Sequence, residues 1–293
     1  MKIIVASGGL GNMMFQYALV LAYRAKGIKT LLFVSEGNAE HNGYELEHVF
    51  SNVKPYKGVN IITKIYYKFL GFLRRLTLRG KRIPHPLLFF PFKAIRTKEA
   101  VLYYPEIANP SNKSCFLIGQ FQSYKYFEHV RTTILHEYSF CFDMLSEKTK
   151  EVYSRINNSN SVSIHIRRGD YLETYFYTGL GSVCNEDYYK RAIQHLDSCI
   201  KNITYFIFSD DKDYVTDHYN LPNMVIVDFN KGSDSWQDMF LMSKCKHNII
   251  ANSTFSWWAA YLNTNQDKVV VAPSRWWGPF EKDDVVPPEW IRL

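Results

Sequence analysis

The chain has 293 residues, of which 46% are hydrophobic and 16% aromatic, and its formal net charge is +7. This composition excludes an intrinsically disordered chain and fits one large or two ordinary domains. The chain contains no run of 18 apolar residues, and its five cysteines form no CxxC pair, so we expect no membrane-spanning helix, disulfide framework or zinc site.

The first 34 residues predict a strand, a glycine-rich turn, a helix and a second strand. Residues 3–6 and 30–34 are short apolar runs typical of buried parallel strands, and 14–25 has helical composition. Gly9-x-Gly11 matches only part of a dinucleotide-binding pattern, because Met14 stands where the third glycine would be. Asn12 and the backbone amides of this turn could still approach a ligand closely. Residues 114–119 predict a further strand.

A basic segment lies between Ser51 and Lys98, where there are 12 lysines and arginines and no acidic residue. The remainder of the chain holds 23 basic and 28 acidic residues. Aromatic and aliphatic residues are interleaved with the basic ones, a mixture typical of segments that contact an anionic membrane surface. A solvated basic face beside a substrate groove explains the charge equally well. We do not expect nucleic-acid binding, because no recognised motif accompanies the charge.

From residue 161 onward, predicted strands and helices alternate regularly. The strands are 162–166, 203–208, 224–227, 248–251 and 268–271, and the helices are 186–200, 212–218, 236–245 and 255–262. This alternation indicates a parallel sheet with right-handed crossovers. We therefore predict an α/β protein with an N-terminal domain, 1–150, carrying the basic segment (about 51–98), and a C-terminal domain, 151–293.

Polar clusters follow three of the predicted C-terminal strands. They are Arg167-Arg168-Gly169-Asp170-Tyr171, Ser209-Asp210-Asp211 and Asn252-Ser253-Thr254. Each cluster alone could be a helix cap, since serine, aspartate and asparagine are favoured there. In an open parallel sheet, however, ligands bind beyond the carboxyl ends of the strands. Three clusters on one edge therefore predict a shared ligand site.

The clusters offer complementary chemistry for a nucleoside diphosphate. The guanidinium groups of Arg167 and Arg168 match phosphate oxygens in a bidentate way. Ser253 and Thr254 precede a predicted helix, whose free N–H groups and dipole favour an anion. Asp210 could accept hydrogen bonds from a ribose or a purine edge. These residues predict a transferase that stabilises a departing diphosphate.

Three further features allow more than one interpretation. His165 lies within a predicted strand and is either a core histidine or a ligand contact. Trp257 and Trp258 fit core packing better than stacking on a sugar. Residues 211–213 match the DxD pattern that holds a metal in some glycosyltransferases, but the central lysine opposes a cation and the arginine pair already supplies positive charge. We therefore predict neither a metal nor a cofactor.

Four motifs, taken in chain order, resemble glycosyltransferase family 11, the α-1,2-fucosyltransferases. They are Gly8–Ala18, His165–Tyr171, Phe208–Asp211 and Asn252–Leu262, so the resemblance covers nearly the whole chain. The first motif has Met13 where glutamine is usual. The resemblance implies a GT-B fold, in which two Rossmann-like domains face each other across a cleft. It also implies transfer of L-fucose from GDP-β-L-fucose to a galactose hydroxyl, with inversion and without metal.

The resemblance also implies roles for individual residues. Arg168, together with Arg167, would hold the β-phosphate and stabilise the leaving group. His165 and Asp210 would lie near the guanine and the ribose. The remaining donor contacts would come from Asn12, Asn252, Ser253 and Thr254, and the acceptor side would include Gln16 and Glu173.

The mechanism that follows is departure of GDP while an acceptor hydroxyl attacks the opposite face of the sugar. Preorganised arginines stabilise the negative charge that develops on the diphosphate. Asp170 is the first candidate for the general base, and it could equally orient an arginine by a salt bridge. Glu173 is the second candidate.

Two rival functions stay open at this point. One is transfer of another sugar, mannose or rhamnose, from a GDP donor. The other is non-catalytic binding of a sugar nucleotide or a membrane surface. Eukaryotic members of the family carry a membrane anchor, so its absence favours a bacterial protein. We expect it in the cytoplasm or peripheral on the inner face of the membrane, with a galactose-containing glycan or lipid-linked oligosaccharide as acceptor.

Overall fold

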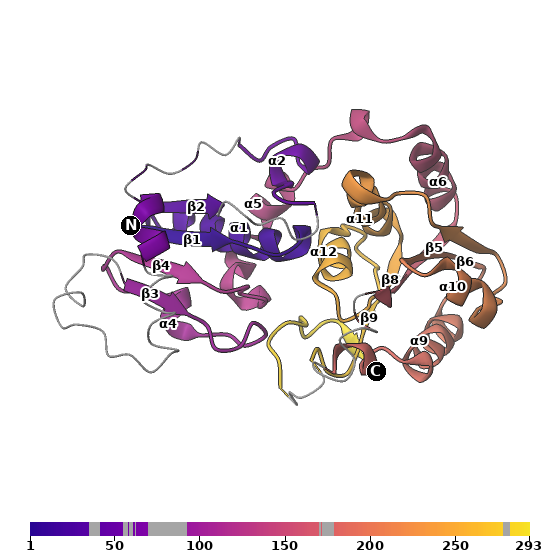
Figure 1. Ribbon diagram of the computed structural model, residues 1–293. Coiled ribbons are helices and arrows are strands. Elements are labelled where there is room, and N and C mark those ends of the chain that lie inside the picture. Colours follow the sequence, from indigo (N-terminus) through magenta and orange to yellow (C-terminus); the bar gives the residue numbers. More distant parts are fainter. Residues whose placement is uncertain are drawn as a thin grey trace.

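The computed structural model describes residues 1–34, 42–54, 58, 61, 63–69, 93–169, 171, 179–277 and 282–293. The strands in these ranges form two sheets, which lie on the left and right of Figure 1. The first sheet has the strand order β2-β1-β4-β3, and the second has the order β10-β9-β8-β5-β6-β7. All paired strands within the two sheets are parallel. The predicted α/β fold is therefore confirmed.

The N-terminal sheet is built around the first predicted strand. Its strands are β1 (Lys2–Ala6), β2 (Thr30–Val34), β3 (Lys93–Arg96) and β4 (Cys115–Ile118). The helices of this half include α1 (Leu10–Ala25), α2 (Leu46–Val49), α4 (Pro105–Ala108) and α5 (Arg131–Glu137). The extended residue Gly9 is the N-cap of α1, so the helix begins four residues earlier than predicted. Gly11 and Asn12 thus lie in the first turn of a helix and not in a loop.

Strand β3 was not predicted from the sequence, because prolines interrupt the region that precedes it. It lies near the end of the basic segment 51–98. Most of that segment falls outside the described residues, including 70–73 and 87–90, which form much of the aromatic and aliphatic sequence on which the membrane-contact prediction depends. Within the described ranges, no helix combines the length and the apolar character that a bilayer span requires.

The C-terminal sheet follows the predicted alternation closely. Its strands are β5 (Asn160–Ile166), β6 (Ile203–Ser209), β7 (Met224–Val227), β8 (His247–Ile249), β9 (Val270–Ala272) and β10 (Ile291–Arg292). The helices are α6 (Glu147–Asn157), α9 (Glu186–Cys199), α10 (Lys212–His218), α11 (Trp236–Lys244) and α12 (Thr254–Leu262). The predicted boundaries of these elements differ from the observed ones by at most two residues, and the terminal strand β10 was missed because it is only two residues long.

Strand β5 shows how the sequence positions the site. Its apolar residues, Val162, Ile164 and Ile166, pack in a cluster that includes residues of α9. The alternate residues face the other way and are polar but buried, and each is hydrogen-bonded: Ser161 to the backbone of Lys246, Ser163 to Asn248, and His165 to Ser256. Because successive side chains of a strand alternate in direction, the continuation of this polar face leads to Arg167.

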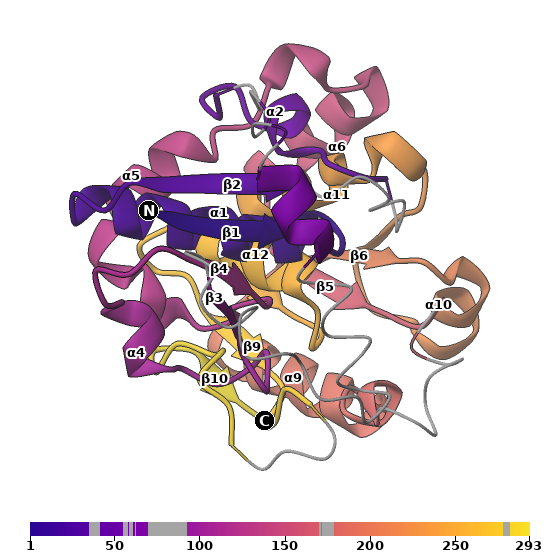
Figure 2. The same cartoon turned by 60° about the vertical axis from the view of Figure 1, so that its left-hand side comes forward.

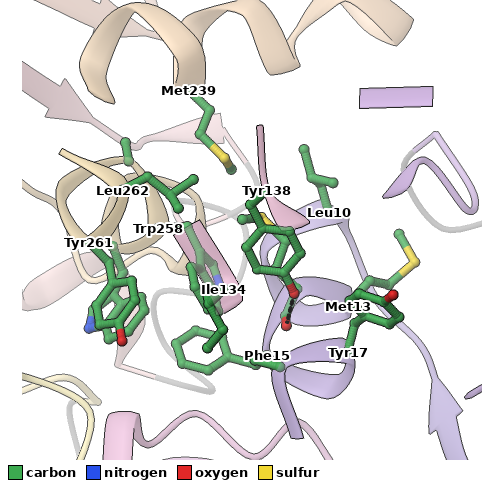
Figure 3. Packing of buried hydrophobic residues seen from close by; sticks show 14 of the residues in the cluster. Leu10, Met13, Phe15, Tyr17, Ile134, Tyr138, Met239, Trp258, Tyr261 and Leu262 are labelled. Atoms are coloured by element: carbon green, nitrogen blue, oxygen red, sulfur yellow. Dashed lines mark hydrogen bonds between the residues drawn. The ribbon is translucent and has the colours of Figure 1, made fainter. Parts of the chain in front are cut away.

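The two halves share one aromatic core, formed where α1 meets α12 (Figures 1 and 2). The ring of Phe15 lies 4.6 Å from that of Trp257 and 4.9 Å from that of Trp258, and both tryptophans are fully buried. Figure 3 shows Trp258 and Tyr261 of α12 near Phe15 of α1 and Tyr138 at the end of α5. The tryptophans are therefore core residues, as the sequence favoured, and they fix the two sheets relative to each other.

The helix starts of α1 and α12 approach each other very closely. The backbone carbonyl of Gly11 accepts a hydrogen bond of 2.9 Å from the indole nitrogen of Trp258. A Cβ atom placed on Gly11 would lie 2.7 Å from the backbone carbonyl carbon of Thr254. Only glycine fits at this point, and the close approach brings two helix N-termini to the same place between the sheets.

Candidate functional site

A cavity of about 690 Å³ lies between the two halves, at the carboxyl ends of strands from both sheets. Its size falls in the range of small-molecule binding sites. The N-terminal half contributes Gly9, Leu10, Gly11, Asn12, Asn42, Glu45, Gln120 and Gln122. The C-terminal half contributes residues that follow β5, β6, β7 and β8, including parts of all three predicted polar clusters. The three clusters that were expected to share a ligand site therefore meet at one cavity.

Arg167 is the arginine of the pair that lines the cavity. Its Nη1 atom lies 2.8 Å from Oδ2 of Asp210, and about a third of its side chain is exposed. The other carboxylate oxygen of Asp210 accepts a hydrogen bond of 2.9 Å from the backbone N–H of Arg168. Asp210 thus holds both the side chain of Arg167 and the turn that carries it. An anion entering the cavity would meet a guanidinium that is already oriented.

Arg168 does not line the cavity, although the sequence and the resemblance placed it first for catalysis. Its guanidinium lies 3.5 Å from the centroid of the Tyr214 ring, and its Nε donates to Oδ2 of Asp211 at 3.0 Å. The backbone N–H of Tyr214 and the Arg168 side chain lower the pKa of Asp211. In this structure, therefore, Arg168 connects the segment after β5 to the N-terminus of α10.

His165 is the last polar residue of β5; it lines the cavity and is almost fully buried. Its Nδ1 is hydrogen-bonded to Oγ of Ser256, at 2.8 Å, in the first turn of α12. Burial, with a further contribution from the Arg167 charge, lowers the pKa of His165 to about 4. The imidazole is thus neutral at pH 7. It links β5, which leads directly into Arg167, to α12, which begins at Thr254.

The third predicted cluster surrounds the N-terminus of α12. Ser253 is the N-cap, and its Oγ accepts from the backbone N–H of Phe255. Ser253 and Thr254 both line the cavity, so the free N–H groups of this helix end face it. Asn252 is buried, and its amide donates to the carbonyls of Leu180 and Trp276. This arrangement is one that favours a bound anion.

The N-terminal half faces this anion site with amide side chains. Asn12 lies in the first turn of α1, and its Oδ1 accepts from Nε2 of Gln122 at 2.9 Å. Gln120 accepts from the same nitrogen. Gln16, predicted on the acceptor side, is instead fully buried, and it bonds the backbone of Ser7 and Gly119. Gln16 thus holds two loops together and does not line the cavity.

Two predicted residues, Asp170 and Glu173, lie outside the described residues. Their roles as general base or arginine-orienting residue therefore stay predictions. The first carboxylate of the DxD pattern, Asp211, is the N-cap of α10, and the central residue, Lys212, pairs with Asp228 at 2.7 Å. Within the described ranges, histidine, cysteine and carboxylate side chains form no cluster of three that could hold a metal ion.

Several cavity residues were missed by sequence reasoning. Asp228, Asn230 and Asp238 line the cavity beyond the end of β7, opposite Asn42 and Glu45 of the N-terminal half. A carboxylate in the first turn of a helix, such as Asp238, normally indicates a solvated helix end. The signal that could have found Asp228 and Asn230 is their position directly after a parallel strand, the same rule that located the other clusters.

The cavity lies between two Rossmann-like units and has an oriented arginine and a helix N-terminus in its wall, an arrangement that suits an anionic ligand such as a diphosphate. The chain belongs to glycosyl transferase family 11, whose profile matches residues 100–293. The family assignment made from the four motifs is thereby confirmed.

Curated relatives extend the match to the full chain. The chain is 32% identical to the O-antigen biosynthesis glycosyltransferase WbnK of Escherichia coli, with 98% of each chain covered. It is also 32% identical to an alpha-1,2-colitosyltransferase of Escherichia coli, covering 100% of this chain and 99% of that one. A galactoside alpha-(1,2)-fucosyltransferase 1 of Leontopithecus chrysomelas is 27% identical over 65% of this chain and 54% of its own length.

Among solved structures, NodZ alpha-1,6-fucosyltransferase soaked with GDP-fucose is similar in fold. The TM-score is 0.51 at 15% identity, and the match covers 89% of this chain and 92% of that one. This likeness concerns the fold alone.

Proposed function

We propose that the protein transfers L-fucose from GDP-β-L-fucose to the 2-hydroxyl of a galactose unit in a glycan, with inversion at the anomeric carbon. The observation that carries this proposal is that Arg167 and the N-terminus of α12 line the same cavity. Both favour a diphosphate, one by charge and the other by free N–H groups. The relative named as a galactoside alpha-(1,2)-fucosyltransferase supports the sugar and the linkage.

The arrangement supports catalysis by stabilising the leaving group. Breaking the bond between sugar and phosphate builds negative charge on the diphosphate, and Arg167 is already aimed at it by Asp210. Loss of one such preorganised contact raises a barrier by roughly 2.7–4 kcal/mol, about 10²–10³ in rate. The neutral imidazole of His165 contributes no charge at pH 7. Asp170 is our first candidate for the base that takes the acceptor proton, and Glu173 is the second.

A second candidate donor is a GDP-linked colitose. The relative that carries this activity in its name matches the full length of the chain, whereas the fucosyltransferase relative matches 65% of it. Colitose is L-fucose without its 3-hydroxyl, so the two donors place the same diphosphate against the same arginine. The choice between them depends on whether a protein group hydrogen-bonds that hydroxyl, which can discriminate strongly.

The proposal is tested by incubating the protein with GDP-fucose, GDP-colitose or GDP-mannose and a panel of β-galactosides, including an O-antigen oligosaccharide. Product mass and linkage are then determined. We expect α-1,2-linked product from GDP-fucose, a loss of about 10²–10³ in rate for Arg167→Ala, and no loss for Arg191→Ala. Arg191 is a matched control, because it pairs with Asp187 on the outer helix α9.

Three results would count against the proposal. Faster turnover of GDP-mannose would indicate another donor, and preference for GDP-colitose would favour the second candidate. Nucleotide binding without product from any donor and acceptor would indicate a non-catalytic protein.

We further propose that neither a metal nor another cofactor takes part, since the cavity supplies positive charge through Arg167. Full activity after treatment with a chelator is the expected result. We also propose that the basic segment 51–98 brings the enzyme to an anionic membrane surface that carries a lipid-linked acceptor. Co-sedimentation with vesicles that contain anionic lipids, but not with neutral ones, is the measurement.

A further inference from the structure

One end of the cavity, beyond strand β7, is lined by Asp228, Asn230 and Asp238 and takes no part in the phosphate site. Asp238 lies in the first turn of α11, which connects β7 to β8. Its side chain is partly buried and forms part of the cavity wall. A carboxylate in this position needs a reason, because removing it from water without a partner is costly.

Asp238 is held in a fixed orientation by a chain of hydrogen bonds from α6. Ser146, the N-cap of α6, is hydrogen-bonded to Oγ1 of Thr149, which donates to Oδ1 of Asn230 at 3.2 Å. The amide oxygen of Asn230 is thereby assigned, and its Nδ2 donates to Oδ1 of Asp238 at 2.8 Å. This chain leaves Oδ2, and the second lone pair of Oδ1, available to a ligand.

Asp238 differs from the two other carboxylates on the same side of the cavity. Asp210 pairs with Arg167, and Asp228 pairs with Lys212. In the part of the chain that the structure describes, Asp238 has no cationic partner within ion-pair distance. Burial, and secondarily the charge of Asp228, raise the pKa of Asp238 to about 7. The group is therefore an acceptor that would gain from a ligand supplying N–H donors.

The order of the strands places this acceptor where a nucleobase would lie. The phosphate site is formed after β8 and β5, by Thr254 and Arg167. Strand β6 is the next neighbour of β5, and β7 follows it. Two strand spacings amount to about 10 Å, which is the reach of a nucleoside from its phosphate group. Asp210, after β6, is then left beside the ribose.

We propose that Asp238, oriented by Asn230, recognises guanine by accepting hydrogen bonds from its ring N1–H and its 2-amino group. The inference rests on the proposed function, which calls for a GDP-linked donor. Guanine presents these two donors side by side, and a carboxylate matches them. Adenine has an acceptor at N1 and no 2-amino group, so it would leave the carboxylate unpaired.

The decisive experiment measures binding of GDP and of xanthosine diphosphate to the wild-type protein and to Asp238→Asn. Xanthine carries a carbonyl in place of the 2-amino group, so the amide nitrogen of the variant can donate where the carboxylate accepted. We expect Asp238→Asn to bind GDP about 10- to 100-fold more weakly and to bind the xanthine nucleotide better than wild type does. Asp234→Asn removes the same charge from an exposed residue outside the cavity and should keep the wild-type preference.

An unchanged ratio of GDP to xanthosine-diphosphate affinity in folded Asp238→Asn overturns the inference. If that variant does not fold, inosine diphosphate tests the wild-type protein, because inosine lacks only the 2-amino group. Equal affinity for inosine diphosphate and GDP overturns the inference, and at least tenfold weaker binding supports it. These binding ratios are independent of turnover. Selective GDP binding without sugar transfer would defeat the proposed function alone, and transfer without base selectivity would defeat the inference alone.

Discussion

Replacing Gly11 with alanine is the most direct test of how the two halves fit together. The new Cβ would lie 2.6 Å from Oγ1 of Thr254, 2.7 Å from its carbonyl carbon and 2.9 Å from the nitrogen of Phe255. Ordinary carbon contacts lie at about 3.5–4.0 Å, so α12 has to move by about 0.8 Å or more. The hydroxyl can rotate away, but the two backbone atoms cannot.

The expected change in the free energy of unfolding is the sum of two costs and one gain. Overpacking costs about 1–3 kcal/mol, and weakening the hydrogen bond from Trp258 to Gly11 costs about 1 kcal/mol. Alanine in a helix returns at most about 1 kcal/mol relative to glycine. We therefore expect Gly11→Ala to lower the free energy of unfolding by about 2 kcal/mol and the melting temperature by roughly 4–8 °C. GDP binding should also weaken, because the N-terminus of α12 moves.

Calorimetry and nucleotide titration of the variant provide the assay. Gly27→Ala serves as the control, since Gly27 has a φ of +72° but a Cβ there would meet no atom within 4 Å. It should cost about 1–2 kcal/mol from its left-handed backbone and leave GDP affinity unchanged. A Gly11→Ala protein with wild-type melting temperature and wild-type GDP affinity would refute the close packing of the two helix starts.

Three further predictions concern the arginine turn and its histidine. Arg168→Ala should lower the melting temperature but reduce kcat/KM far less than Arg167→Ala, which should reduce it by about 10²–10³. Equal losses of kcat/KM in steady-state kinetics would contradict the conclusion that Arg167, and not Arg168, faces the ligand. Gly169→Ala places a Cβ 2.8 Å from Oδ2 of Asp210, so it should raise the KM for the donor, whereas an unchanged KM would show that the turn adapts. Burial lowers the pKa of His165 to about 4, so the unfolded chain binds more protons below pH 6.5 and stability falls as the pH drops toward 4. In denaturant titrations from pH 8 to pH 4, His165→Gln should lack up to about 3 kcal/mol of that fall, and parallel curves would contradict this prediction.

The C-terminal sheet was predictable because each strand and helix is short, regular and separated by turn residues. The rule that ligands bind beyond the carboxyl ends of parallel strands then located Arg167, Asp210 and Thr254 correctly at one cavity. That rule depends on topology alone, so it needs no knowledge of side-chain packing.

The sequence did not distinguish the two adjacent arginines. Alternation along β5 carries the polar face from Ser163 through His165 to Arg167, and Arg168 falls on the other side. The alternation along β5 was visible in the sequence. Which of the two faces of the strand meets the cavity, however, is decided by the packing of the N-terminal half against α12. Gln16 was misplaced for a related reason, since a motif shows that a residue matters without showing whether it contacts a ligand or supports a loop.

Asp238 could not have been singled out from the sequence. A carboxylate at a helix start is normally solvated, and only the burial of α11 against α6 and the hydrogen bond from Asn230 give it another role. The pairing of such a group depends on residues distant in the chain, which local patterns do not contain.

The aromatic contact of α1 with α12 limits how this enzyme can admit a substrate and how it can be re-engineered. Rigid-body opening of the two halves would expose both buried indoles to water, so we expect such a motion to be costly. A hybrid that joins residues 1–145 to the second half of another transferase would inherit mismatched rings at this seam, and we expect such hybrids to aggregate unless both helices are exchanged together.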